Sequence, residues 1–534
     1  MFKHPGKRNA IQYFPSASII LFTLDKKTNE LLIYLAKRRD DLKFFPGLYS
    51  GIGGKIEKSD YKFAELIKNN SDFSESPDEI SYLICAWREL LEEVGIFYYK
   101  TNNTELGNRV LNYAISQKSI DISVLFEKFQ LNIHNIHFND FIKAGFRYTP
   151  EFTNKIFTTR FYLLYIDNEN YYPLINDSHN EFTTGLWAKP EDLFLKFKQN
   201  KFQTSPPILG VIRELFNFPK LKKSGNSILP YNAIEVLNTN DDLPLGLQVR
   251  IEPHSGIQII PFKSLTRPPA TTTNFIIIGN EKKIIVDPGT HIPQEKKRLD
   301  LIVNLLKADD SEVMFQVITH HHQDHWQAAT YIRDKYDIPI ALHPQFNDYL
   351  DESEIIPIDL KLSDEQRINL GVDKFNKINW DIRVKFLPGH TNDHLVLIDE
   401  RFQALMAGDL IAGVGTVIIE NLEQYYSSLK YLDKENITMI FPGHGPVITK
   451  GKEVIKNYIR HRTLRGEQIL ATINSGQGKT IKEITQKVYK DIPNSFLMIA
   501  EKQVRVYMKY FKDKNWVKFN PNNSKWIQTK EKVH

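Results

Sequence analysis

One segment of this sequence concentrates residue types that bind metals. Residues 313–318 are apolar and rich in branched and aromatic side chains, which predicts a buried strand. The chain then reads Thr-His-His-His-Gln-Asp-His from Thr319 to His325, and a helical pattern begins at Trp326. Imidazole nitrogens and carboxylates are ligands that suit Zn²⁺. A turn that carries five of them predicts a zinc site, and a His-rich loop of biased composition is the alternative.

Four other segments, one before the histidine segment and three after it, have the same form: an apolar run that ends in a potential ligand. They place Asp287, His390, Asp409 and His444 directly after predicted strands, each with a glycine within two residues. Glycine allows the backbone to turn sharply into a site. This long-range pattern favours a metal site over a biased loop.

In this order the segments resemble the metallo-β-lactamase fold superfamily, whose motif HxHxDH is followed by His, Asp and His. The resemblance implies an αββα sandwich that binds two zinc ions. The implied ligands are His320, His322 and His390 for one ion, Asp324, His325 and His444 for the other, and Asp409 as the bridge. Two such ions can hold a hydroxide and clamp a scissile phosphate or carbonyl, and we expect Asp324 to take part in catalysis.

The same resemblance suggests roles for four further residues. Asp287 is expected to orient a ligand histidine, and His394 is a candidate proton donor to the leaving group. His321 is expected to point away from the site, and His343 to be structural. A β-lactamase proper is disfavoured, because those enzymes generally use a cysteine in the second site and lack the bridging aspartate. Asp409 instead fits hydrolases of thioesters and phosphodiesters.

A second group of candidate ligands lies on a predicted helix at residues 86–96. Glu89, Glu92 and Glu93 are spaced three and four residues apart, so they share one face. Like charges at this spacing repel by a few tenths of a kcal/mol per pair. A hard cation such as Mg²⁺ or Mn²⁺ would explain the cluster. The alternative is a solvated acidic face.

These residues resemble the Nudix box, in which a glycine is followed by REUXEEXGU, where U is aliphatic. Gly54 and residues 88–96 match, but about 20 additional residues interrupt the box, and the expected upstream Glu is replaced by Ile80, with Glu79 as a near substitute. A similar interruption, with segments like residues 149–152 and 159–161, occurs in the branch that includes coenzyme A diphosphatases. Trp187 is similar to the end of a Nudix closing strand.

The Nudix resemblance implies an α/β/α sandwich that cleaves a pyrophosphate bridge. Glu92 and Glu93 would bind Mg²⁺ or Mn²⁺, and Glu89 would be a ligand or the base. The implied substrate is a nucleoside diphosphate-linked or coenzyme A-type small molecule. A domain that only binds such a molecule is the alternative.

The last segment of the chain is basic. From Gly451 to His534 there are 18 Lys and Arg against 7 Asp and Glu, a net charge of +11, whereas the rest of the chain carries −6. Two helical patterns and two short strands, at 516–519 and 525–527, resemble a winged helix. The basic side chains that fall outside its apolar stripe and are available for phosphates are Lys502, Arg505, Lys509 and Lys512. The alternative is a basic face that merely packs on the hydrolase.

Length and composition set the remaining bounds. A chain of 534 residues predicts two to four domains, which we place at 1–220, 241–450 and 451–534 with a linker at 221–240. The single cysteine, Cys85, excludes an internal disulfide and favours a reducing compartment. No apolar run approaches the about 18 residues of a membrane span. We expect a cytoplasmic protein and a possible homodimer, with a transit peptide left open.

The sequence therefore predicts a multidomain α/β and α+β protein with two hydrolase sites. In the leading hypothesis, a Nudix pyrophosphohydrolase is fused to a binuclear zinc hydrolase that cleaves single-stranded RNA, with a winged helix at the end. A domain of the second kind followed by a basic tail resembles β-lactamase-like endoribonucleases. In the alternative, the zinc site is a glyoxalase-II-like thioesterase that acts on an acyl-thioester, and the Nudix domain acts on coenzyme A derivatives.

Overall fold

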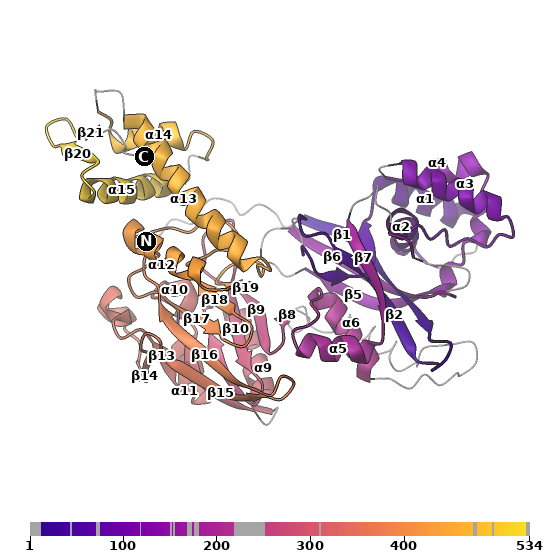
Figure 1. The fold of residues 1–534 in the computed structure, drawn as a ribbon, viewed down its shortest axis with the longest axis horizontal. Coiled ribbons are helices and arrows are strands. Elements are labelled where there is room, and N and C mark those ends of the chain that lie inside the picture. The colour runs from indigo at the N-terminus through magenta and orange to yellow at the C-terminus, as the bar shows by residue number, and fades with distance from the viewer. Residues whose placement is uncertain are drawn as a thin grey trace. The chain divides into compact units, whose positions relative to one another are not determined.

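The chain is described by a computed structural model that covers residues 12–42, 45–70, 75–117, 119–149, 152, 155–167, 173–175, 181–217, 251–308, 311–473, 478–493 and 496–529. These residues form two compact units, divided near residue 258 (Figure 1). The predicted linker at 221–240 lies outside the described residues, as do Pro150 and Glu151 of the 149–152 segment. The domain bounds therefore stay a prediction.

The first unit is built on a seven-stranded sheet. Its strands are β1 (Gln12–Leu24), β2 (Leu31–Arg38), β3 (Tyr49–Ser50), β4 (Ile52–Lys55), β5 (Phe141–Tyr148), β6 (Lys155–Tyr165) and β7 (Phe182–Ala188). The main path runs β3-β2-β1-β6-β5, while β4 pairs with β1 and β7 pairs with β2. β1 and β6 are parallel, and the other neighbours are antiparallel. The strands predicted at 18–22 and 31–35 are confirmed within β1 and β2.

Helices cover both faces of this sheet. On one face are α1 (Lys58–Asn70), α2 (Pro77–Val94), α3 (Thr104–Ser116) and α4 (Ile122–Phe129), and on the other are α5 (Pro190–Lys198) and α6 (Pro206–Asn217). Ile19 and Leu21 of β1 pack into the first cluster, whereas Ile20 and Phe22 pack into the second. This alternation is the two-residue period of a strand, and it makes the unit a three-layered α/β/α sandwich.

The helix that carries the three glutamates is longer than predicted. α2 begins with Pro77, and the hydroxyl of Ser76 caps it. The predicted stop is confirmed, because Gly95 ends the helix with a φ of 63°. The start predicted at Ala86 is wrong by nine residues, because apolar residues that include Ile80 extend the buried face toward the N-terminus.

Residues 251–442 form two further sheets. The first, in the order β14 to β8, contains β8 (Ile251–His254), β9 (Ile257–Lys263), β10 (Thr272–Gly279), β11 (Lys282–Val286), β12 (Glu312–Val317), β13 (Ile340–Leu342) and β14 (Leu360–Lys361). The second, in the order β15 to β19, contains β15 (Arg367–Asp373), β16 (Ile378–Phe386), β17 (Leu395–Asp399), β18 (Ala404–Gly408) and β19 (Met439–Pro442). The predicted apolar strands before Asp287, His320, His390, Asp409 and His444 are confirmed as β11, β12, β16, β18 and β19.

Helices lie on the outer faces of these sheets. α9 (Pro293–Ala308) and α11 (Ala329–Tyr336) share a buried cluster with the first sheet, and α12 (Leu422–Lys434) shares one with the second. The short helix α10 (Gln323–Trp326) follows the histidine segment. The arrangement is the predicted αββα sandwich, and the candidate ligands lie where its strands end.

The basic segment packs on this sandwich. It contains α13 (Gly451–Ile473), α14 (Ile481–Val488), α15 (Leu497–Asp513) and the hairpin β20 (Val517–Asn520) with β21 (Lys525–Gln528). The predicted apolar stripe of α15 is confirmed, because Val504, Tyr507, Met508 and Phe511 are buried in one cluster with α12. The basic side chains predicted to lie outside the stripe, Lys502, Arg505, Lys509 and Lys512, are exposed. None of the helices within the described ranges has the length and apolar character needed to cross a membrane.

Candidate metal centre

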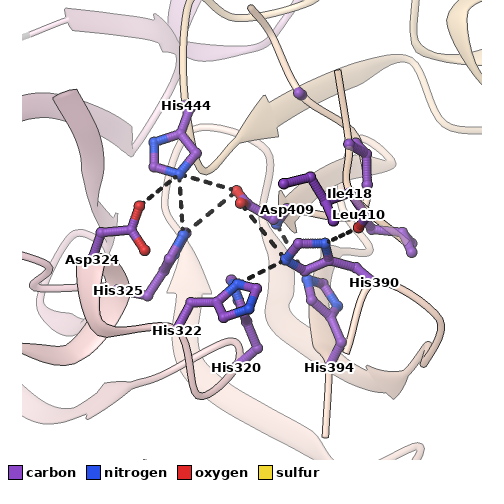
Figure 2. A network of polar contacts seen from close by, with 12 residues as sticks. His320, His322, Asp324, His325, His390, His394, Asp409, Leu410, Ile418 and His444 are labelled. Carbon is purple, nitrogen blue, oxygen red and sulfur yellow. Dashed lines mark hydrogen bonds and ion pairs between the residues drawn. The ribbon is translucent and has the colours of Figure 1, made fainter. Parts of the chain in front are cut away.

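Three histidine rings converge at the end of β12. His320 Nε2 and His390 Nε2 each lie 3.0 Å from His322 Nδ1. A carboxylate oxygen of Asp409 completes this group, in which the four donor atoms lie within 4.8 Å of one another (Figure 2). His320 and His390 are buried.

A second group lies beside the first. His325 Nε2 is 3.3 Å from His444 Nε2, and Asp324 Oδ2 is 3.4 Å from the same atom. Asp324 and His325 are in the first turn of α10, directly after His322, so the strand-to-helix turn supplies ligands to both groups. The structure thus brings together all seven residues that were predicted to bind zinc.

Asp409 lies between the two groups. Its Oδ1 is 3.5 Å from His325 Nε2 and 3.3 Å from His444 Nε2, whereas its Oδ2 is 3.7 Å from His390 Nε2. One oxygen of Asp409 therefore faces each group, as the predicted bridging role would require. Gly408 before it has a φ of 49°, and a Cβ there would come within 2.8 Å of His394 Nε2. Only glycine therefore fits at that turn.

Backbone carbonyls fix the orientation of two ligand rings. His390 Nδ1 is 2.6 Å from Ile418 O, and His444 Nδ1 is 2.9 Å from Thr272 O. A carbonyl only accepts hydrogen bonds, so Nδ1 carries the hydrogen in both rings. The Nε2 atom of each neutral ring therefore presents a lone pair to the centre.

Asp287 orients two further ligand histidines, whereas the sequence predicted that it would orient one. Its Oδ2 accepts a hydrogen bond from His325 Nδ1 at 2.8 Å and another from the Thr319 hydroxyl at 2.8 Å. Because that hydroxyl donates to Asp287, its oxygen accepts from His320 Nδ1 at 3.0 Å. His325 and His320 thus also turn their Nε2 lone pairs toward the centre.

This donor set fits zinc. The Nε2 lone pairs of neutral His325 and His444 face one another at 3.3 Å, an arrangement that is repulsive unless a cation or a proton lies between them. A tetrahedral zinc site with Zn–N bonds of about 2.0–2.1 Å separates its ligand nitrogens by about 3.3 Å. In the first group, burial and neighbouring histidines lower the pKa of His322 to about 3, so this ring is neutral and one of its nitrogens has a lone pair for a metal ion. Burial likewise lowers the pKa of His390 to about 4.

In the second group, carboxylates have a stronger effect on the histidine pKa than in the first group. Burial lowers the pKa of His444, but Asp409 and Asp324 outweigh it and raise the pKa to about 10. The two carboxylates that stabilise a proton on His444 would also stabilise a metal cation at this position, because a divalent ion carries more charge than a proton. A cation and a proton therefore compete for this position.

Two other predicted histidines have well-defined contacts. His394 is fully buried, and its Nε2 accepts the backbone N–H of Asp409 at 3.2 Å. His321 Nδ1 is 2.8 Å from Asp393 Oδ1, and its ring stacks on Tyr349. One nitrogen of His321 also lies within 4.8 Å of donor atoms of His322 and Glu420, so its ring lies beside the centre.

Two of the three glutamates of α2 bind the same arginine. The buried guanidinium of Arg88 donates from Nη1 to Glu89 Oε1 and to Glu92 Oε2, both at 2.8 Å. The second oxygen of Glu92 accepts the N–H of Ile120, so both oxygens of Glu92 already accept a hydrogen bond. Glu93 accepts the N–H of Gly53 at 2.9 Å. Within the described part of this unit, no three such donor groups lie within 4.8 Å of one another.

Asp60 is a residue of this site that the sequence did not reveal. Its two oxygens accept from Arg88 Nε and Nη2, each at 3.0 Å, and it is fully buried in the first turn of α1. Glu79, the suggested substitute, instead pairs with Arg160 at 2.7 Å. The available signal was an acidic residue at the start of the helix that follows Gly54.

Gly54 leaves room for the Glu89 carboxylate. A Cβ on Gly54 would come within 2.1 Å of Glu89 Oε1. Burial raises the pKa of Glu89 to about 8, although Arg88 opposes this effect. Burial also raises the pKa of Glu93, with repulsion from Glu89. A nearby cation would stabilise the ionised forms of these two buried carboxylates.

Comparisons with known proteins point to one superfamily for residues 268–444. The sequence profile of the Metallo-beta-lactamase superfamily matches residues 268–444. Beta-lactamase-like protein 2 homolog of Caenorhabditis elegans is 31% identical over 267 residues, 48% of this chain and 84% of its own. Atrochrysone carboxyl ACP thioesterase of Aspergillus chevalieri is 24% identical over 44% of this chain and 73% of its own. The crystal structure of a NUDIX hydrolase from Alicyclobacillus acidocaldarius covers 41% of this chain and 99% of its own, with 18% identity and a TM-score of 0.32.

Proposed function

Because this chain belongs to the metallo-β-lactamase superfamily, whose members are metal-dependent hydrolases, we propose that its metal centre hydrolyses phosphodiester bonds of single-stranded RNA. The observation that carries the choice of substrate is a row of four exposed basic side chains on α15. This helix lies in the same compact unit as the metal centre.

The row has the geometry of a phosphate-binding surface. Lys502, Arg505, Lys509 and Lys512 follow one another at intervals of three and four residues, so they lie on one face of α15. At 1.5 Å per residue they span about 15 Å along the helix axis. Cations in such a row bind the backbone of a nucleic acid without reading its sequence.

The residues of the centre have distinct roles in this proposal. Two zinc ions held there would supply a nucleophile at neutral pH and neutralise charge on the scissile phosphate. Asp409 would contribute negative charge to both groups and Asp324 to the second. His394 accepts the Asp409 backbone N–H at Nε2, so its ring hydrogen is on Nδ1, and its candidate role as proton donor would use that atom.

Hydrolysis of an acyl-thioester is the second candidate. The similarity to an acyl carrier protein thioesterase supports it. A centre that clamps a phosphate can also polarise a thioester carbonyl, so the ligands alone do not separate the two reactions. The basic row on α15 is the feature that favours RNA.

One experiment separates these candidates. Zinc-loaded protein would be assayed on single-stranded RNA and on an acyl-thioester, with His322→Ala as the inactive variant. His343→Ala is the matched control, because His343 is buried but belongs to neither ligand group. We expect RNA cleavage that His322→Ala abolishes and His343→Ala retains. Thioester turnover with intact RNA would favour the second candidate, and zinc binding without turnover of either substrate would overturn both.

We further propose that the first unit is a Nudix-type pyrophosphohydrolase dependent on Mg²⁺ or Mn²⁺. Glu89 and Glu93, whose pKa values are raised and which lie beside Gly54 and Gly53 of β4, support this assignment. Its substrate would be a nucleoside diphosphate-linked or coenzyme A-type molecule. Turnover of such a pyrophosphate that is lost in Glu93→Gln would support activity. Binding without turnover by wild-type protein would leave only a recognition role.

A further inference from the structure

One of the zinc-ligand candidates is oriented by a segment that the basic C-terminal region holds in place. His390 Nδ1 donates to the carbonyl of Ile418 at 2.6 Å, as Figure 2 shows. Ile418 lies between β18 and α12, outside any strand or helix. Because this segment belongs to no helix or sheet, no regular series of backbone hydrogen bonds fixes the direction of this carbonyl. Other contacts must do so.

The peptide group that contains this carbonyl also forms a hydrogen bond on its opposite side. The Ile418 carbonyl and the Ile419 N–H belong to one planar trans peptide and point in opposite directions. The Ile419 N–H donates to Oε1 of Gln503 at 3.1 Å. One rigid peptide group therefore joins Gln503 of α15 to His390, and the two hydrogen bonds polarise each other.

The next peptide group repeats this arrangement. The Ile419 carbonyl accepts from Nε2 of Gln503 at 3.0 Å. On the other side of that peptide, the Glu420 N–H donates to the carbonyl of Gly389 at 2.9 Å. The side-chain amide of Gln503 thus fixes two consecutive peptide groups, and each presents its opposite atom to the His390 segment.

A second side chain of the C-terminal region supports the same segment. The guanidinium of Arg462, which is buried in α13, donates from Nη2 to the carbonyl of Val417 at 2.7 Å. The hydroxyl of Tyr507 in α15 donates to the carbonyl of Arg462 at 3.1 Å. Residues 417–419 are therefore held by two helices that lie outside the αββα sandwich.

We propose that Gln503 is a positioning residue of the metal centre, which acts by fixing the direction of the carbonyl that orients His390. The C-terminal region is then part of the metal centre as well as a candidate RNA-binding surface. This inference rests on the proposed zinc centre but not on the choice of substrate. The partners that orient a ligand histidine commonly change metal affinity by about 10–100-fold when they are removed.

The test compares zinc affinity and ligand-field spectra of full-length variants. Gln503→Met keeps the length of the side chain and removes both hydrogen bonds, and Gln503→Glu keeps the acceptor for Ile419 N–H but replaces the donor with a second acceptor. We expect zinc affinity, measured by competition with a chromophoric chelator, to fall by about 10-fold or more in both. The visible spectrum of the Co²⁺-loaded variants should also shift, because the ring of His390 turns.

Thr485→Val is the matched control. It removes a buried hydrogen bond of α14, from Oγ1 of Thr485 to Ile481 O at 2.8 Å, and Thr485 has no bond to residues 417–421. It should lower thermal stability without changing zinc affinity or the Co²⁺ spectrum. The proposal is overturned if Gln503→Met and Gln503→Glu lose stability but keep wild-type zinc affinity and spectrum. Because both readouts are independent of turnover, failure on RNA would not affect this result.

Discussion

Asp287 and His325 are joined by a hydrogen bond of 2.8 Å between Oδ2 and Nδ1, although 38 residues separate them in the chain. Both side chains are buried. Asp287 follows β11 with a φ of 52°, and this turn brings its carboxylate under both ligand groups. One carboxylate therefore sets the tautomer of His325 directly and that of His320 through Thr319.

Asp287→Ala should therefore weaken zinc binding more than it weakens the fold. We expect a loss of affinity of about 10–100-fold, since the rings of two ligands lose their orientation. Chelator competition measures it. Asp300→Ala, which removes an outer carboxylate that accepts bonds from Tyr331 and Tyr336, is the control and should keep wild-type affinity. Equal affinity in the two variants would contradict the role of Asp287.

Asp409→Asn should separate the two metal positions. The bridging charge is lost, while the side-chain volume is kept. Because the second group depends on this carboxylate to attract a cation, we expect zinc content to fall from about two ions per chain to about one. Elemental analysis after gel filtration measures the content. Two retained ions would show that the carboxylate does not bridge.

Asp60→Ala should destabilise the first unit strongly. It leaves one side of the buried Arg88 guanidinium without its bidentate partner. Removing one partner of a buried ion pair costs about 3–5 kcal/mol in free energy of unfolding. Urea unfolding measures the loss. Glu79→Ala, whose ion pair with Arg160 is more exposed, should cost clearly less. The reverse order would contradict the assignment of Asp60 as the main partner of Arg88.

Glu89 should make the stability of α2 depend on pH. Its pKa is raised from an ordinary value of 4.5 to about 8. The folded state therefore holds a proton that the unfolded state loses between these values, so the stability contribution is full below pH 4.5 and is lost as pH rises through 8. Glu89→Gln cannot ionise. Relative to wild type, it should protect the α2 amides from hydrogen exchange more at pH 8 than at pH 5.

A cation provides the control for that prediction. Mg²⁺ should increase protection in wild-type protein at pH 8, because it compensates the charge of the ionised carboxylate. It should have little effect on Glu89→Gln. A difference between variant and wild type that is the same at pH 5 and pH 8 would exclude a raised pKa for Glu89.

The basic row of α15 should determine the salt dependence of RNA binding. Arg505→Ala combined with Lys509→Ala removes two exposed cations. For single strands each phosphate contact contributes about 0.7 to the slope of log K against log salt, so the slope should decrease by about 1.4. Fluorescence anisotropy at several salt concentrations measures it. Lys297→Ala with Lys361→Ala removes the same charge from exposed positions elsewhere and should keep the wild-type slope.

The sequence by itself determined the metal centre to a large extent. Each ligand follows an apolar strand, and the strand pattern, the neighbouring glycine and the ligand type are all local signals. These signals are sufficient to place His320, His390, Asp409 and His444 at strand ends. The αββα layers then bring those ends together, and the structure shows all seven candidates in two adjacent groups.

Only the tertiary structure decided which polar groups support these ligands. Arg88 and its partner Asp60 are 28 residues apart, and Gln503 lies 84 residues from Ile419. No periodic pattern connects such residues, because their contact depends on how helices pack and not on local backbone preference. The same holds for the partners of two glutamates: Glu92 accepts from Ile120 as well as from Arg88, and Glu79 pairs with Arg160, through contacts made across the sandwich.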